Sequence, residues 1–106
     1  MVEYMTMRES AHQYDRLLRE FNEERVSALR RISDTLESLI EQLHALRARI
    51  PQLTGSERAR ELVVYRELRR CAIRYRWYLE VQREALGLRH HHRLDEFYAV
   101  PDALDP

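Results

Sequence analysis

Three consecutive histidines near the end of the chain are the first residues whose chemistry stands out, because imidazole binds metal ions and titrates near neutral pH. Neighbouring side chains on a helix point about 100° apart, so the three cannot bind one ion together from a helix. A helical segment would instead pair His91 with Asp95 and His92 with Glu96, each four residues apart. A zinc site needs at least one further ligand. His12 could supply it if the C-terminal segment folds back onto the first helix, so a metal- or pH-sensing site is one alternative.

A run of arginines between residues 66 and 76 is the second candidate for chemistry. Guanidinium groups on one helix face could hold the phosphates of a nucleic acid or of another polyanion. The same arginines could instead pair with acids of the first helix, such as Glu37 and Glu41. The formal net charge of the chain is zero, so no global field draws it to a polyanion. Polyanion binding is therefore a second alternative, and its residues would be Arg66, Arg69, Arg70, Arg74 and Arg76.

The sequence contains no set of residues suited to enzymatic catalysis. No glycine-rich loop could cradle phosphates, and all 18 basic residues are arginines, which excludes a catalytic lysine. Cys71 is the only cysteine, so neither an intrachain disulfide nor a cysteine zinc cage can form. It has no histidine nearby in the sequence, and its place in the second helix predicts a small packed residue rather than a nucleophile. We therefore expect a protein that is not an enzyme and has no cofactor.

The composition of the 106 residues is typical of one helical domain. Charged residues make up 34% and hydrophobic residues 44%, with only two glycines, and this mix favours helices over a sheet or a disordered chain. No run approaches about eighteen apolar residues, as a membrane span requires. The first ten residues lack the apolar core of a signal peptide. We therefore expect a cytoplasmic protein, and the exclusive use of arginine among the basic residues indicates a GC-rich bacterial genome.

The first apolar pattern predicts a long helix over residues 7–49. Its apolar residues alternate in steps of three and four, which is the spacing of a coiled-coil seam. Thr6 and Glu9 have the spacing of a capping box and so mark the start of the helix. The seam residues are Leu29, Ile32, Leu36, Leu39, Leu43, Leu46 and Ile50.

The second apolar pattern predicts a helix over residues 57–86, after a turn over residues 50–56. Thr54 and Glu57 repeat the capping-box spacing. Gly87 follows the last seam residue, at the position where a left-handed C-cap places glycine. The seam residues of this helix are Tyr65, Leu68, Ala72, Tyr75, Leu79, Gln82 and Leu86.

Two such helices joined by a short turn form an antiparallel hairpin, so we predict one all-α domain over residues 1–106. The first helix is longer than the second and extends beyond it near residues 7–20. We expect the tail over residues 87–106, which could form a short third helix, to fold back and cover this extension. The apolar residues that it would cover are Tyr14, Leu17, Leu18 and Phe21.

A second apolar stripe lies on the second helix, away from its seam, at Ile73, Trp77 and Val81. A two-helix hairpin buries little core by itself, so the stripe predicts a partner. A second copy is the simplest partner and would give a two-fold four-helix bundle, whereas in a monomer the tail would cover the stripe. We therefore predict a non-enzymatic interaction, scaffold or regulatory module that packs helix against helix with a second copy or another helical protein. Trp77 should be its main contact.

Overall fold

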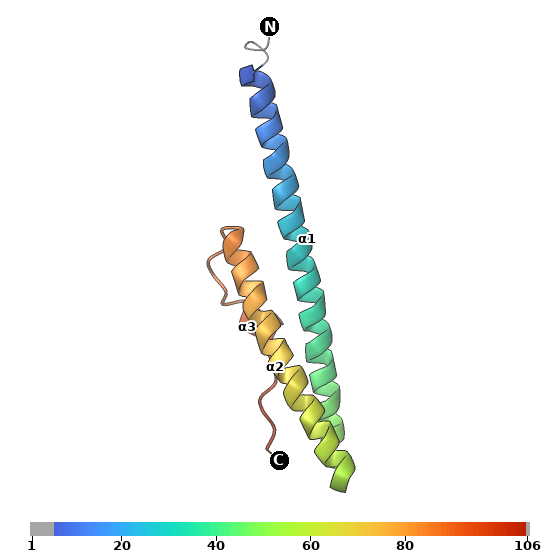
Figure 1. The fold of residues 1–106 in the computed structure, drawn as a ribbon. Helices are drawn as coiled ribbons and strands as arrows, with labels where there is room; N and C mark the ends of the chain where they lie inside the picture. Colours follow the sequence, from blue (N-terminus) through green and yellow to red (C-terminus); the bar gives the residue numbers. More distant parts are fainter. Residues whose placement is uncertain (1–5, 106) are drawn as a thin grey trace.

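The computed structural model describes residues 6–105, and within them the chain is helical without any strand (Figure 1). Helix α1 (Thr6–Arg49) leads through a short 3-10 helix, η1 (Ile50–Gln52), into helix α2 (Gly55–Ala85), which returns antiparallel along α1. A third helix of four residues, α3 (Leu94–Phe97), follows in the C-terminal segment. The predicted all-α hairpin with a short third helix is therefore confirmed, while its dimerisation stays a prediction.

The ends of the two long helices lie within two residues of the predicted ones, but the predicted capping differs. The capping box predicted at the start of the first helix depends on the side chain of Thr6. This side chain and residues 1–5 lie outside the described part of the chain. Thr54 does precede α2, yet its side chain makes no capping hydrogen bond, so the second capping box is wrong. The turn instead depends on Gly55, whose φ of 62° lies in the left-handed region that glycine adopts without strain.

Helix α2 ends in a Schellman motif, as the position of Gly87 predicts. The Gly87 amide donates to the Glu84 carbonyl at 2.9 Å, and the Leu88 amide donates to the Arg83 carbonyl at 2.9 Å. These two bonds satisfy carbonyls that the end of a helix leaves without partners. Gly87 has a φ of 86°, which a residue with a Cβ adopts only with strain.

Replacing Gly87 with alanine should lower the free energy of unfolding by about 1 kcal/mol, because the left-handed conformation costs an L-residue about that much. A Cβ at this position would meet no atom within 4 Å, so the expected loss comes from the backbone alone. Urea unfolding followed by circular dichroism measures it. An unchanged midpoint would show that the turn tolerates another conformation.

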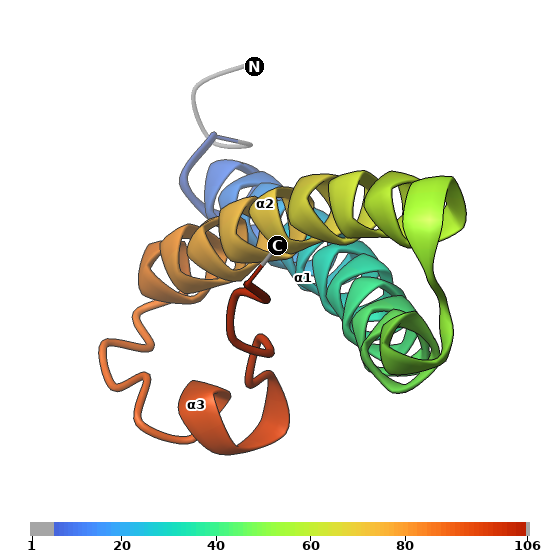
Figure 2. The same ribbon diagram turned by 90° about the horizontal axis from the view of Figure 1, so that it is seen from below.

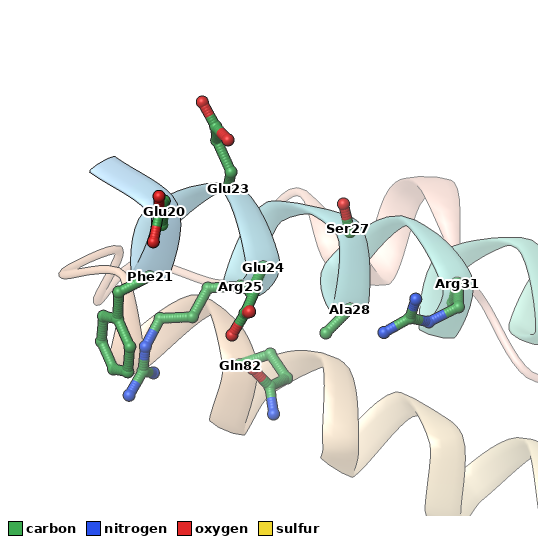
Figure 3. A pocket seen from close by; sticks show the side chains of 9 residues that line it. All are labelled: Glu20, Phe21, Glu23, Glu24, Arg25, Ser27, Ala28, Arg31 and Gln82. Carbon is green, nitrogen blue, oxygen red and sulfur yellow. The ribbon is translucent and has the colours of Figure 1, made fainter. Parts of the chain in front are cut away.

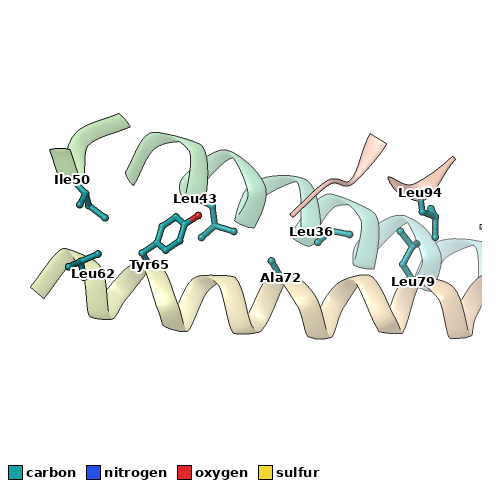
Figure 4. Close-up of a cluster of buried hydrophobic side chains, with 8 residues drawn as sticks. All are labelled: Leu36, Leu43, Ile50, Leu62, Tyr65, Ala72, Leu79 and Leu94. Atoms are coloured by element: carbon teal, nitrogen blue, oxygen red, sulfur yellow. The ribbon is translucent and has the colours of Figure 1, made fainter. Parts of the chain in front are cut away.

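The core is a single file of buried side chains between the two long helices (Figure 4). Side chains from α1 and α2 alternate along it, and the seam positions predicted from the sequence supply most of them. Two of them lie outside the predicted seams, namely Leu62 of α2 and Leu94 of α3. The buried residues are Leu36, Leu43, Ile50, Leu62, Tyr65, Ala72, Leu79 and Leu94.

The C-terminal segment runs back beside α2 toward the turn of the hairpin, so the prediction that it covers the extension of α1 is wrong (Figures 1 and 2). Three side chains hold its backbone. Tyr65 Oη donates to the carbonyl of Asp102 at 2.6 Å, and Arg47 Nη1 donates to the same oxygen at 3.3 Å. Arg69 Nε donates to the carbonyl of Pro101 at 2.9 Å. We call residues 98–105 the C-terminal strap; three of its apolar side chains pack against the core: Tyr98, Val100 and Leu104.

The molecule is long and thin, with extents of 80 × 25 × 14 Å. It exposes 8477 Å² of surface, whereas a compact domain of its mass exposes about 6300 Å². The part of α1 that extends beyond α2, which we call the overhang (residues 7–21), is exposed along its whole length. None of the helices in the described part of the chain combines the length and apolar character that crossing a membrane requires. The overhang exposes these large apolar side chains: Met7, Tyr14, Leu17, Leu18 and Phe21.

Candidate interaction surfaces

The stripe predicted on α2 is exposed in the structure. Ile73, Trp77 and Val81 follow one another at intervals of four residues, so they lie along one face of the helix. Trp77 is 58% exposed, although a tryptophan carries one of the largest apolar surfaces of any residue. Its ring contacts that of Tyr78 at a centroid distance of 5.6 Å, and this contact holds the indole against the helix. The stripe is thus a ready apolar contact surface.

A shallow recess of about 480 Å³ borders the stripe where the C-terminal segment meets α2. Ile73 and Trp77 line its α2 side, and Tyr98, Ala99 and Val100 line the other. The strap therefore borders the stripe and leaves it exposed, so the prediction that the tail would cover it in a monomer is wrong, while the number of chains in the assembly stays a prediction.

Arg76 fixes the recess by joining α3 to α2. Its guanidinium donates to the carboxylates of Glu80 and Asp95 at once. Burial opposes the charge of Arg76, but the hydrogen bonds and the two negative charges outweigh burial and raise its pKa. The group therefore stays charged and keeps α3 in place, and it is not available to a phosphate.

The other arginines of the predicted polyanion site do not form one surface. Arg69 holds the strap, and Arg70 pairs with Glu67 at 3.2 Å. Arg66 and Arg74 are exposed, and no ion pair to either occurs within residues 6–105. The predicted acidic partners on α1, Glu37 and Glu41, are also exposed and make no salt bridge to α2 in the described part of the chain.

The histidines are not brought together as a metal site. The ring of His91 lies against α2, where Arg83 Nε donates to Nδ1 at 3.4 Å and Nε2 donates to Glu84 Oε1 at 3.1 Å. The predicted helical pairs do not form, because α3 begins only at Leu94. Asp95 is bound to Arg76 instead.

The remaining members of the predicted metal site lie apart from His91. His12 is exposed on the overhang, which the C-terminal segment does not reach, and His92 and Glu96 are exposed as well. No group of three histidine, cysteine or acidic residues suited to a metal occurs in the part of the chain that the structure describes. Cys71 is exposed, not packed as predicted, because Ala72 takes the core position beside it.

The overhang is a second exposed apolar surface, because the tail that was predicted to cover it runs along α2 instead. Where α2 ends, a recess of about 880 Å³ opens between Gln82 and the α1 residues Glu24 and Ala28 (Figure 3). The Arg25 guanidinium lies over the ring of Phe21 at 4.3 Å from its centroid, at the boundary between covered and uncovered helix. The spacing from Tyr14 to Phe21 identifies its apolar residues, but Asn22 and Arg25 interrupt the pattern before the seam begins at Leu29.

The fold and these surfaces define an all-α hairpin with two uncovered apolar faces. No protein-family model, no curated protein and no solved structure matches the chain at a significant level. The two exposed apolar surfaces are therefore the features that bear on its function.

Proposed function

We propose that this protein is a non-enzymatic interaction module, which acts by packing the stripe of α2 against the same stripe of a second copy. The observation that carries the proposal is the exposure of Trp77 between two other apolar residues on one helix face. Buried aromatic residues dominate the binding energy of such interfaces. A hairpin with a one-layer core also buries little apolar surface by itself, so covering this face would add to its stability.

The order of residues along α2 supports an antiparallel two-fold pairing centred on Trp77. Ile73 and Val81 each lie four residues from Trp77, so each would face the other residue in the second copy. Arg70 and Glu84 each lie seven residues away, which is about two helical turns, so they would also face each other. A two-fold interface requires such self-complementarity. The pairing would give the four-helix bundle predicted from the sequence.

Replacing Trp77 with glutamate should lower the mass of the assembly at least twofold, because the interface would have to bury a charge at its centre. Light scattering coupled to size exclusion measures the mass. The matched control is Val64→Glu, since Val64 is 44% exposed on the same helix but points away from the stripe. An unchanged mass for the Trp77 variant would refute the proposal, and so would equal effects of both variants.

A further inference from the structure

The overhang of α1 continues the face that α1 turns toward α2. Three of its apolar residues precede seam residues of α1 by eighteen positions, which is about five helical turns, so each points in the same direction as its counterpart. The counterparts pack in the core or against it. The pairs are Leu18 with Leu36, Phe21 with Leu39 and Tyr14 with Ile32.

One apolar face therefore runs along α1, and α2 covers only its C-terminal part. Gln82, near the end of α2, lies beside Glu24 and Ala28, so the covered part of α1 ends close to these residues (Figure 3). Beyond them Leu18 is 42% exposed, and the other large apolar side chains of the overhang are exposed too. A helix in line with α2, beyond its C-terminal end, would cover the overhang as α2 covers the rest of this face.

We propose that this helix is the overhang of a second copy, packed antiparallel across a two-fold axis near Tyr14. Antiparallel packing repeats the direction that α2 already has on this face. Met7 and Phe21 each lie seven residues from Tyr14, so they would face each other between the copies, and both overhangs would be covered at once.

The exposed area agrees with an interface of this kind. The chain exposes 8477 Å², roughly 2000 Å² more than a compact domain of its mass. A specific interface of standard size removes about 800 Å² from each partner. The excess is thus large enough for the overhang interface and for the separate interface at the stripe of α2.

This inference goes beyond the proposed function, because it uses a different surface. A chain with two separate two-fold interfaces forms either a closed assembly of at least four chains or a continuing filament. The assembly of the native protein should therefore hold at least four chains, in which overhang contacts and stripe contacts alternate.

The test replaces Leu18 with glutamate, which puts a charge into the proposed interface without touching the hairpin core. The mass from light scattering should fall at least twofold. The control is Val26→Glu, because Val26 is 45% exposed on the same helix and lies about 100° around it from the overhang face; its mass should equal that of the native protein. The double variant Leu18→Glu with Trp77→Glu should be a monomer of 12.9 kDa.

Two outcomes would overturn the inference, namely an unchanged mass for Leu18→Glu or a Trp77→Glu variant that is already monomeric. Failure of the proposed function looks different, because then Trp77→Glu keeps the native mass while Leu18→Glu lowers it. Amide hydrogen exchange gives an independent measurement. Protection of residues 7–21 should rise with protein concentration, and exchange that is equally fast at all concentrations would also refute the pairing.

Discussion

Replacing Leu36 with alanine should lower the free energy of unfolding by about 2–5 kcal/mol. Leu36 is completely buried at the centre of the file of core side chains (Figure 4). With one layer of core between two helices, few neighbouring side chains can move to fill the cavity, so a value toward the upper end is expected. A loss of this size is a large part of the stability of a small domain. Urea unfolding at low protein concentration measures it.

The matched control is Leu17→Ala, the same substitution on the exposed part of the same helix. It should change the free energy of unfolding by less than about 0.5 kcal/mol, as exposed positions generally do. Similar losses for both variants would mean that α1 is covered along its whole length even at low concentration. Such a result would contradict the single-file core described above.

The second large effect is expected at Tyr65, which fills the core and also holds the C-terminal strap. Tyr65→Ala should lower the free energy of unfolding by about 3–5 kcal/mol, as large aromatic deletions do. Tyr65→Phe keeps the ring but removes the hydroxyl that donates to the carbonyl of Asp102, so it should lose only about 1 kcal/mol. The two variants therefore separate packing from strap attachment.

Hydrogen exchange and limited proteolysis give the specific readout for the strap. In Tyr65→Phe the strap should exchange and be cleaved faster while α1 and α2 keep their protection. Tyr14→Phe is the control, because the Tyr14 side chain is exposed, and it should behave like the native protein. A strap that stays protected in Tyr65→Phe would show that its apolar side chains suffice to hold it.

The hairpin could be predicted from sequence because its determinants are local and periodic. The steps of three and four fix which face of each helix is apolar, and Gly87 marks a helix end through its own backbone conformation. The buried positions Leu36, Leu43 and Ala72 follow directly from that spacing. Leu62 is three residues from Tyr65, so it extends the seam of α2 by one step beyond the predicted seam residues.

The path of the C-terminal segment could not be predicted, since the bonds that hold it are not encoded by residue type. Tyr65 and Arg69 donate to backbone carbonyls, which every residue carries. The choice between covering the overhang and following α2 depends on distances between segments far apart in the chain. The same limit applies to His91, whose contact with Arg83 and Glu84 exists only because the segment turns back at Gly87.

Of the two candidate surfaces, the stripe of α2 could be identified because Ile73, Trp77 and Val81 are apolar at helical spacing but off the seam. The seam residues Ala72 and Leu79 face the core, so the stripe on another side of the helix was predicted to face outward. The overhang was recognised as apolar, but its uncovered state depended on the path of the strap. The wrong path predicted for the C-terminal segment therefore led to the wrong prediction that the overhang is covered.

The position of the turn at one end of the hairpin also has a consequence for the order of folding. Contacts beside the turn, such as that of Ile50 with Leu62, close the shortest loops, and contacts farther along the helices close longer ones at a greater entropic cost. The helices should therefore join from the turn outward, and the strap can attach only after Tyr65 and Arg69 are in place. The overhang leaves the ribosome before α2 is made, yet within one chain it never gains a neighbour.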